Sequence, residues 1–495
     1  MSINITKAAV VGGGVIGAGW IARLLENSID VHVYDPDPEA QRKIDAVLSN
    51  AEAAYEKLTA APRRTKGKLT LENNLAAAVS NSQLIVESVP EDLAIKQTVY
   101  AQIEESAPDD AIITSSTSGI MPSDLQARMR APERLIVAHP FNPVYLLPMV
   151  ELVGGSKTSA ATVDRTDAIC KFMGMRPLRV KKEIDAFIAD RLLESVWREA
   201  LWLVRDGVAT TEDIDDAIRF GFGLRWAQMG LFETYRIAGG EAGMKHFLGQ
   251  FGPTLSWPWT RLMNVPELTD ELVELISSQS DEQSGKYGIR ELEQIRDTNL
   301  VSIMQALKDN EWGAGLTLDS YEKTLFSEAD NNIDNAEIDV SRPIETVNRR
   351  VPADWTDYNG HMNESRYLQC FSDASDYLMR LVGVSAEYIK TTGSYFTVET
   401  HIQNIDETTA GEQINVQTQI VDLAGKKLHV IHSMYHADGR LLATGEHMLL
   451  HVSLETRRAT EPAESVLNKA TEIATAHKAL ELPNGTGRFV GQARS

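Results

Sequence analysis

Three spacings of apolar residues follow one another along the chain. In residues 1–186, short apolar runs alternate with amphipathic helices, which is typical of strands buried in a parallel sheet. We expect strands at Ala8–Val11, Asp30–Tyr34, Leu84–Val89, Ala111–Thr114, Arg134–Ala138 and Met149–Val153. From residue 187 to 327 the spacing becomes that of long helices, such as Arg191–Arg205 and Thr269–Ile276. The pattern therefore predicts a doubly wound α/β domain followed by an all-α domain.

The third spacing begins after an acidic, proline-closed stretch at residues 328–342, which we interpret as a linker. In residues 343–455 one helix, about Glu364–Val382, precedes four segments in which apolar and polar residues alternate. These segments are Ser394–Asn404, Gln413–Asp422, Lys427–His436 and Arg440–Leu454. A long helix against an antiparallel sheet is an α+β layer. The tail, 456–495, contains one more predicted helix at Glu461–Ala479 and no evident chemistry.

The first strand runs into a glycine-rich turn. Gly12, Gly14 and Gly17 form G-x-G-x-x-G at the start of a predicted helix, and Asp35 ends the second strand. The glycines suit a tight turn, close approach of a pyrophosphate and close helix packing, and the carboxylate suits the two ribose hydroxyls. The cofactor-binding set is completed by Val15 and Ile16, which open the helix. A 2′-phosphate would be repelled by Asp35, so this Rossmann unit predicts NAD rather than NADP; the alternative is a tight turn that binds nothing.

Composition narrows the function further. Hydrophobic residues make up 43% of the chain and charged residues 24%, which is typical of a globular protein. The formal net charge of −22 argues against nucleic acid and anionic membranes as partners. The two cysteines, Cys170 and Cys370, make a disulfide framework or a cysteine metal site improbable, and we predict no metal. We find no run of transmembrane length and no signal peptide, so we expect a cytoplasmic protein.

Polar residues follow the later strands of the first domain. Ser118 lies in the loop after one strand, His139 and Asn142 follow the next, and Glu151 lies within the last. Ligands of doubly wound sheets bind beyond the carboxyl ends of the strands, so we expect these side chains to face the nicotinamide. Oxidation of a secondary alcohol needs a base for the hydroxyl proton, and a carboxylate stabilises the imidazolium that forms.

About residues 5–325 resemble the 3-hydroxyacyl-CoA dehydrogenase superfamily. The matching segments are VVGGGVIGAGW, ESVPEDLAIK, SSTSGI, HPFNPVYLLPMVEL and FIADRLL. The resemblance implies that His139 is the catalytic base, oriented by Glu151, and that Ser118 and Asn142 contact the substrate oxygen. It also implies that Glu91 and Lys96 lie on the cofactor side.

One position departs from that family. FIADRL carries Asp190 where the family usually has Asn close to the reacting hydroxyl. An acid there suits a cationic substrate and disfavours an anionic one. The alternative is that Asp190 pairs with Arg191 or Arg198 on a helix face.

The helical domain is rich in aromatic residues, and its segment GLRWAQMGLFET resembles the lambda-crystallin, sugar-acid and carnitine dehydrogenase branch of the superfamily. Four aromatics are candidate substrate contacts, because electron-rich rings bind quaternary ammonium groups: Trp226, Tyr235, Trp257 and Trp259. The alternative is that they lie in the core or in a subunit contact. In this family the helical domain forms the contact of a homodimer.

The string VPADWTDYNGHMNESRY resembles hotdog-fold acyl-CoA thioesterases of the 4-hydroxybenzoyl-CoA type, over about residues 343–455. The resemblance implies that Asp357 is the catalytic carboxylate, with His361 and Asn363 beside it. Thioester hydrolysis needs such a carboxylate, as nucleophile or base, and N–H donors for the oxyanion, which a helix N-terminus supplies. The alternative is that Asp357 and Asn359 only form a turn and a cap.

The fusion of the two parts resembles carnitine dehydrogenases that carry a betainyl-CoA thioesterase domain, which implies carnitine and betainyl-CoA as substrates. The strongest competitors are an L-gulonate-type or a 3-hydroxyacyl-CoA dehydrogenase. Two alternatives of another class are a non-catalytic, crystallin-like protein and a C-terminal domain that only senses acyl-CoA.

Overall fold

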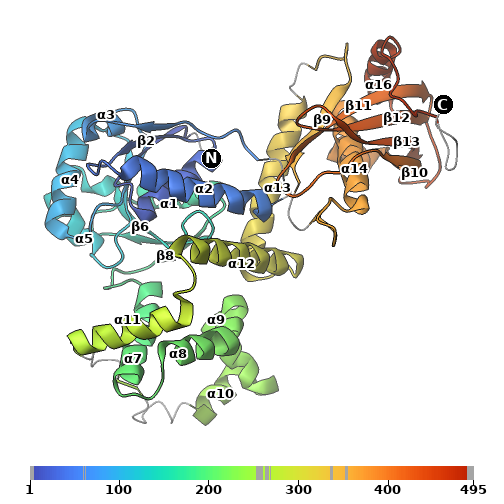
Figure 1. Ribbon diagram of the computed structural model, residues 1–495. Helices are drawn as coiled ribbons and strands as arrows, with labels where there is room; N and C mark the ends of the chain where they lie inside the picture. Colours follow the sequence, from blue (N-terminus) through green and yellow to red (C-terminus); the bar gives the residue numbers. More distant parts are fainter. Residues whose placement is uncertain are drawn as a thin grey trace. The chain divides into compact units, whose positions relative to one another are not determined.

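The computed structural model divides into two compact units, residues 1–325 and 326–495 (Figure 1). It describes residues 5–59, 61, 63–251, 260–261, 267, 269–334, 338–351 and 355–487. The candidate residues Trp257 and Trp259 lie outside the described residues. Each unit is described by itself below.

Unit 1 is built on an eight-stranded sheet in the order β3-β2-β1-β4-β5-β6-β7-β8. The strands are β1 Lys7–Val11, β2 Asp30–Tyr34, β3 Leu69–Leu71, β4 Leu84–Glu87, β5 Ile112–Ser115, β6 Leu135–Pro140, β7 Met149–Gly154 and β8 Arg176–Val180. All neighbours are parallel except β6 and β7. The predicted strands are present, and β6 extends through His139 and Pro140, which we had placed in a loop. The short β3 and the largely polar β8 form the two edges, where no apolar run marked them.

Helices cover both faces of this sheet. They are α1 Val15–Glu26, α2 Ala40–Leu58, α3 Leu75–Val79, α4 Leu93–Ser106, α5 Pro122–Leu125 and α6 Ala160–Phe172. Successive residues of β1 enter opposite cores: Ala8 and Val10 pack with α1 and α6, whereas Ala9 and Val11 pack with α3, α4 and α5. This two-sided burial explains why the strand sequence is a continuous apolar run rather than an alternation.

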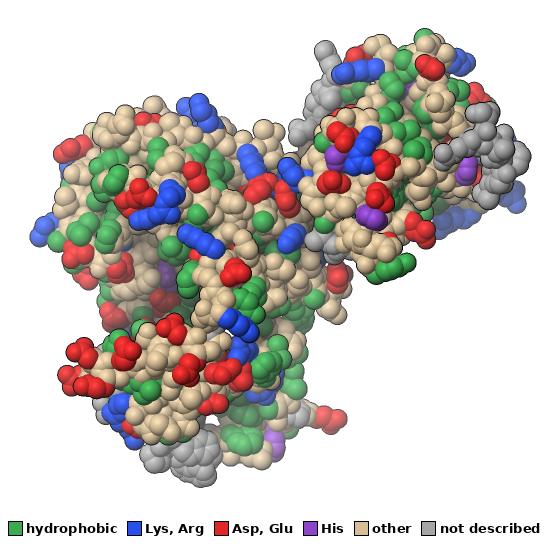
Figure 2. Space-filling view, in the orientation of Figure 1, with side chains coloured by type: hydrophobic (Ala, Val, Ile, Leu, Met, Phe, Trp, Pro, Cys, Tyr) green, Lys and Arg blue, Asp and Glu red, His purple; other side chains and the backbone are tan. Residues whose placement is uncertain are grey.

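The next helices form a lobe of unit 1. They are α7 Ala189–Arg205, α8 Thr211–Ala217, α9 Gly223–Ala238, α10 Gly243–Phe251 and α11 Asp270–Ser284, with a π-helical turn at Ile218–Phe222. The start of α8 is fixed by a capping box, in which Thr210 and Asp213 each bind the other's backbone N–H. Large apolar side chains remain exposed on this lobe, among them Leu193 (60%), Trp197 (57%) and Phe232 (71%), and Figure 2 shows hydrophobic side chains gathered on its surface.

The last two helices of unit 1 return to the sheet domain. α12 (Ile289–Asp309) packs against α2, and Val301, Met304 and Leu318 join a core cluster with Tyr55 and Leu58. The predicted all-α domain, 187–327, is therefore not one packed body: its C-terminal part adds a layer to the Rossmann domain. α13 (Gly313–Asp334) also occupies the first residues of the segment that we interpreted as a linker.

Unit 2 is an antiparallel sheet in the order β10-β13-β12-β11-β9. The strands are β9 Ile344–Arg350, β10 Gly393–Asn404, β11 Gln413–Ala424, β12 Lys427–His436 and β13 Leu441–Ser453. The helix α14 (Glu364–Leu381) lies close against the sheet, and a Cβ on Gly445 would collide with the ring of Phe371. Two further helices are α15 Ala386–Thr391 and α16 Glu464–His477. Val466, Ala470 and Ile473 of α16 belong to the same core, so the predicted tail helix is part of this α+β domain.

A chain of polar side chains crosses the core of unit 2. Ser375 Oγ lies 2.9 Å from His432 Nε2 and 3.3 Å from His447 Nδ1, and His432 Nδ1 lies 2.8 Å from the hydroxyl of Thr418. Thr418 in turn shares a hydrogen bond of 2.7 Å with Thr346. Burial lowers the pKa of His447 to about 4 and that of His432 well below its usual range, so both imidazoles are neutral in the fold.

This burial predicts that unit 2 loses stability in acid. The unfolded chain binds a proton at His447 near pH 6.5, whereas the folded chain binds it only near pH 4. Stability is therefore fully present above pH 6.5 and falls as the pH drops toward 4, by on the order of 3 kcal/mol for this group. Denaturant unfolding of the full chain at a series of pH values measures it. His447→Gln should make the dependence shallower; an unchanged slope would assign it to other groups.

Candidate functional site

The glycine turn presents open backbone at the start of α1. Gly12 has φ +97°, and a Cβ there would stand 2.5 Å from Ser88 O, so only glycine fits. A Cβ on Gly17 would collide with Gly12 O, whereas one on Gly14 would meet nothing within 4 Å. No side chain caps this helix, and the adjoining Val15 is 59% exposed. The turn is therefore closed by packing at Gly12 and Gly17 and left accessible at Gly14, as phosphate binding requires.

Asp35 lies beside the same turn. Its Oδ2 accepts a hydrogen bond of 2.6 Å from Gly13 N, and its Oδ1 accepts one of 2.8 Å from Asp37 N. The carboxylate is thus held at the end of β2 next to the glycines. Gly12, Gly14, Gly17 and Asp35 are brought together as predicted, and the open backbone and the fixed acid suit the phosphates and ribose of NAD.

A buried polar contact joins His139 and Glu151. The two residues lie directly opposite each other on β6 and β7, and Nδ1 of His139 is 2.9 Å from Oε2 of Glu151. Both side chains are buried, and the rings of Phe141 and Phe187 lie 4.8 Å and 5.7 Å from the imidazole. The pairing fixes the ring and leaves Nε2 as the atom that faces outward from the pair.

Glu151 also binds the start of α7. Its Oε1 accepts hydrogen bonds from Ile188 N at 2.9 Å and Ala189 N at 3.0 Å. Burial by itself raises the pKa of Glu151, but the hydrogen bonds from His139 and from the two backbone N–H groups outweigh it and hold the pKa below its usual range. The carboxylate is therefore ionised and ready to stabilise an imidazolium.

Asp190 faces the other nitrogen of the same histidine. Its Oδ2 lies 3.7 Å from Nε2, too far for a direct hydrogen bond. The predicted alternative of a helix-face pair is not what the structure shows, since Arg191 donates to Asp185 O and Arg198 contacts Glu194. Burial raises the pKa of Asp190, and the nearby imidazole of His139 lowers it. The negative charges of Glu151 and Glu194 raise it again, so the net pKa lies above its usual range. His139 thus stands between two acids.

Ser118 and Asn142 lie on the exposed loops that follow β5 and β6. These strands pair in register, with Ser115 opposite Val137, so both loops leave the same edge of the sheet. Glu91 holds the first loop: its carboxylate accepts a hydrogen bond from the hydroxyl of Thr117 and from Ser118 N (3.0 Å). We had predicted Glu91 and Lys96 as cofactor contacts, but Lys96 is only 1% exposed and its ammonium faces Glu87 and Glu91. Lys96 is thus a buried ion-pair partner of Glu87 and Glu91, and sequence reasoning missed Glu87.

The two described aromatic candidates pack against aromatics of their own lobe. The ring centroid of Trp226 lies 4.5 Å from that of Phe222, and Tyr235 stacks on Phe247 at 4.6 Å. Both rings are half-buried, and these contacts favour the alternative that they serve packing within the lobe.

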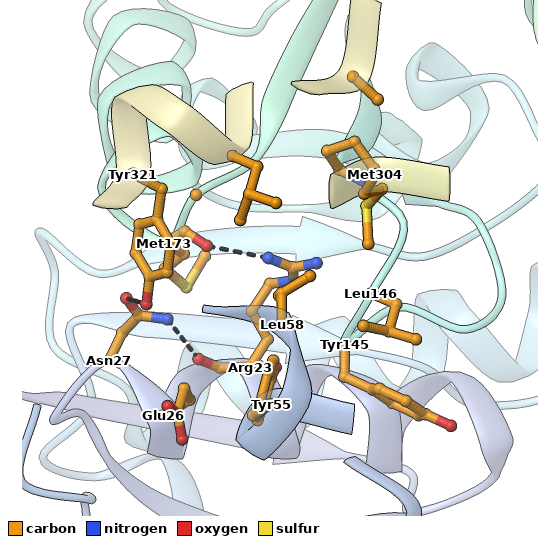
Figure 3. Close-up of a pocket in the computed structure, with 14 residues that line it drawn as sticks. Arg23, Glu26, Asn27, Tyr55, Leu58, Tyr145, Leu146, Met173, Met304 and Tyr321 are labelled. Carbon is orange, nitrogen blue, oxygen red and sulfur yellow. Dashed lines mark hydrogen bonds between the residues drawn. The ribbon is translucent and has the colours of Figure 1, made fainter. Parts of the chain in front are cut away.

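A cavity of about 30 Å³ lies elsewhere in unit 1, between the sheet domain and α12 and α13 (Figure 3). Arg23 points into it and donates to Met173 O at 2.9 Å and Val144 O at 2.7 Å. Its lining includes no predicted site residue, and its volume suits about one water molecule. We interpret it as a packing defect under the added helical layer.

In unit 2, Asp357 is part of a tight turn. Its Oδ1 accepts hydrogen bonds from Asn359 N at 2.8 Å and His361 N at 3.3 Å, and Gly360 has φ +82°. Within the part of the chain that the structure describes, its Oδ2 has no recorded partner. His361 Nδ1 lies 3.3 Å from Glu407 Oε2. The predicted turn is real, and it leaves one carboxylate oxygen unengaged.

Asn363 is the N-cap of α14. Its side chain accepts from Ser365 N at 3.0 Å, and its carbonyl accepts from Arg366 N at 2.9 Å. The helix therefore begins at Glu364, and its cap is Asn363 rather than Asn359. Two N–H groups of its first turn are already bound, which leaves fewer oxyanion donors than we expected.

The comparisons with known proteins agree along the whole chain. Residues 7–184 match the NAD-binding domain of 3-hydroxyacyl-CoA dehydrogenase, 187–286 its C-terminal domain, and 351–470 the thioesterase-like superfamily. An L-carnitine dehydrogenase/betainyl-CoA thioesterase of Ruegeria pomeroyi is 56% identical over 98% of this chain and 99% of that protein. A protein of the same name from a Rhizobium species is 51% identical over 99% of each.

Among solved structures, an NAD⁺-dependent FHMPC 5-dehydrogenase is 29% identical, covers 61% of this chain and 99% of its own, and has a TM-score of 0.52. These relatives confirm NAD as the cofactor and the predicted fold of each part. No helix in the described ranges has the length and apolar character needed to cross a membrane.

The position of Asp35 predicts the choice of dinucleotide. The wild type should bind NADH at least ~10-fold tighter than NADPH, and Asp35→Ala should bring the two dissociation constants close together. Fluorescence titration with each nucleotide measures both constants. Asp37→Ala, which removes the neighbouring acid, is the matched control and should keep the preference; equal affinities in the wild type would refute the assignment of Asp35.

Proposed function

The chain belongs to the family of bifunctional L-carnitine dehydrogenase/betainyl-CoA thioesterases, and on that premise we propose a division of labour between its two units. Unit 1 oxidises L-carnitine to 3-dehydrocarnitine with NAD. Unit 2 hydrolyses betainyl-CoA to glycine betaine and CoA. The observation that carries the first assignment is the position of His139 between Glu151 and Asp190.

His139 is the base of the oxidation. Its Nε2 takes the proton of the substrate hydroxyl while the hydrogen on the carbinol carbon leaves as hydride, for which NAD is the acceptor. Glu151 accepts the Nδ1 hydrogen bond and stabilises the imidazolium, and α7 keeps Glu151 ionised through its first N–H groups. Ser118 and Asn142 hold the substrate oxygen in place for the transfer.

Asp190 accounts for a cationic substrate. Oδ2 of Asp190 lies 3.7 Å from Nε2 of His139. In carnitine one CH₂ group separates the trimethylammonium nitrogen from the carbinol carbon, so a hydroxyl bound at Nε2 brings the cation next to Asp190. Two opposite charges about 4 Å apart attract by about 1–4 kcal/mol between bulk-water and surface dielectric values. L-Gulonate, an anion of another shape, gains nothing from this acid. Trp226 and Tyr235, which pack within their lobe, are not required by this arrangement. Trp257 and Trp259 stay predicted cation–π contacts of the trimethylammonium group.

The substrate assignment predicts both the preference of the wild type and the effect of one substitution. NADH formation should be fastest with L-carnitine among L-carnitine, L-gulonate and 3-hydroxybutyryl-CoA. Asp190→Asn keeps the shape but loses the charge, so kcat/KM for L-carnitine should fall by roughly 10–100-fold, mainly through KM.

The matched control is Glu194→Gln, one turn further along α7, whose partner is Arg198. It should leave kcat/KM for L-carnitine nearly unchanged. If the wild type prefers L-gulonate, then L-gulonate and not carnitine is the substrate. If it oxidises none of the three compounds, the crystallin-like alternative is favoured.

Asp357 is the catalytic carboxylate of unit 2. Either it attacks the thioester carbonyl and forms an anhydride that water then hydrolyses, or it activates a water molecule that attacks the carbonyl directly. In both cases CoA leaves as the thiolate, which is then protonated. His361 and Asn363 flank it on the same turn and at the head of α14. The support for this role is that the turn fixes one oxygen of Asp357 by two backbone N–H groups and directs the other away from them.

We also propose that the protein is a cytoplasmic homodimer. The helical lobe leaves Leu192, Leu193, Trp197, Phe220 and Phe232 more than half exposed. Such apolar surface on a monomer marks an interface, and a second copy of the lobe would cover it. The two cysteines are free and buried, which supports a reducing compartment.

The role of Asp357 predicts that Asp357→Asn loses thioesterase activity and keeps dehydrogenase activity. Asn preserves shape and hydrogen bonds but is neither nucleophile nor base, so betainyl-CoA hydrolysis should fall by at least ~10²-fold. Release of CoA thiol measures hydrolysis, and NADH formation in the same preparation is the internal control. If most hydrolysis survives, unit 2 is an acyl-CoA-binding module or uses another group such as His361.

A further inference from the structure

A buried acid lies beneath the Ser118 loop. Glu87 ends β4 and is fully buried, and each of its oxygens has two donors. Oε1 accepts from Lys96 Nζ at 2.7 Å and Val89 N at 2.8 Å, and Oε2 accepts from Tyr100 OH at 2.6 Å and Ser115 Oγ at 2.7 Å. A buried charge with this many partners is costly to assemble, and the reaction proposed above makes no direct use of it.

Lys96 connects this acid to the surface. Its ammonium is 1% exposed and lies between two carboxylates, 2.7 Å from Glu87 and 3.4 Å from Glu91, with Val89 O at 3.2 Å as its third acceptor. The closer carboxylate is the buried one. Glu87 therefore sets the position of the ammonium, and the ammonium sets the electrostatic environment of Glu91.

Glu91 in turn binds the loop that carries Ser118. Besides the hydroxyl of Thr117, its Oε1 accepts hydrogen bonds from Ser118 N at 3.0 Å and Gly119 N at 3.2 Å. Burial raises the pKa of Glu91, but the hydroxyl of Thr117 and the charge of Lys96 lower it more, and the net pKa is below its usual range. An ionised Glu91 is the better acceptor, so three consecutive residues of the loop are bound to one carboxylate oxygen.

We propose that Glu87 is a positioning residue of the dehydrogenase site, which holds Lys96 against Glu91 and thereby fixes the loop that carries Ser118. The inference rests on the proposed role of Ser118 in contacting the substrate oxygen. Glu87 binds Lys96, Lys96 contacts Glu91, and Glu91 accepts hydrogen bonds from the loop N–H groups. Glu87 itself touches neither substrate nor cofactor.

The physical consequence of losing only the charge is specific. In Glu87→Gln the amide keeps the volume of the side chain, and the hydroxyls of Tyr100 and Ser115 can turn to accept from its NH₂. Lys96 then has one carboxylate partner instead of two, and its ammonium shifts toward Glu91. Glu91 in turn loses its fixed distance to Ser118 N and Gly119 N. A displacement of about 1 Å at a substrate-contacting group can cost ~10²-fold in rate.

The test is a double-mutant cycle on the full-length protein with Glu87→Gln and Ser118→Ala, read as kcat/KM for L-carnitine. Glu87→Gln alone should lower kcat/KM by about 10–100-fold, whereas in the Ser118→Ala background it should lower it by less than about threefold. The dissociation constant of NADH should change far less than kcat/KM. Effects that multiply in the double variant, or an NADH affinity that falls as much as kcat/KM, would overturn the proposal.

Two further variants separate positioning from general loss of stability. Glu26→Gln breaks another buried ion pair of unit 1, in which Arg63 lies 2.6 Å from Glu26; it should lower the melting temperature and leave kcat/KM unchanged. Tyr100→Phe removes one donor to Glu87 and is the milder probe if Glu87→Gln does not fold. It should lower kcat/KM by about threefold, with the same dependence on Ser118; a full-activity Tyr100→Phe or an inactive Glu26→Gln counts against the proposal.

A wild type that fails to oxidise L-carnitine refutes the proposed function and not this inference. In that case the cycle is measured with L-gulonate or 3-hydroxybutyryl-CoA, whichever the wild type oxidises. Independence of Glu87 and Ser118 with an active wild type refutes the inference alone.

Discussion

The hydrogen bonds of the Glu151 carboxylate hold the proposed dehydrogenase site of unit 1 together. One oxygen binds the imidazole of His139 across β6 and β7, and the other binds the first two N–H groups of the helical lobe. The residue is fully buried, so an unpaired charge here would be strongly unfavourable, and each partner is needed by the other. The same carboxylate thus orients the base and determines where α7 begins. Because α7 begins there, Asp190 in its first turn faces His139.

The sequence predicted the parts of the fold whose pattern is local. Continuous apolar runs marked the strands that are buried on both faces, and alternation marked β10, β11, β12 and β13 of unit 2. β9 (Ile344–Arg350) was not predicted. β8 was missed because its residues, RPLRV, lie at an edge and carry no apolar run. The return of α12 and α13 to the sheet domain was missed because amphipathic spacing shows that a helix has a buried face and not which surface covers it.

The candidate site divides in the same way. The glycines and Asp35 were predicted because their chemistry is bound to a fixed spacing along the chain, whereas the roles of His139 and Glu151 came from the family resemblance of their segments. Lys96 was assigned to the cofactor side by the family resemblance, whereas the structure buries its ammonium between Glu87 and Glu91. Trp226 and Tyr235 were predicted as substrate contacts only because the helical domain is rich in aromatic residues. In the structure both rings pack against other aromatic rings of the lobe, which the spacing of residues along the chain does not reveal.

The contact between α2 and α12 also constrains how the chain folds during its synthesis. Asn50 donates to Glu293 and Gln305 donates to Lys57 O, so residues nearly 250 positions apart close the outer layer of the first domain. While the ribosome is still producing the helical lobe, α2 already packs against α1, but the cluster around Tyr55 still lacks Val301, Met304 and Leu318. The nascent Rossmann domain therefore exposes an apolar helix face until α12 and α13 emerge, a long-range closure that slows folding and makes a chaperone useful in that interval.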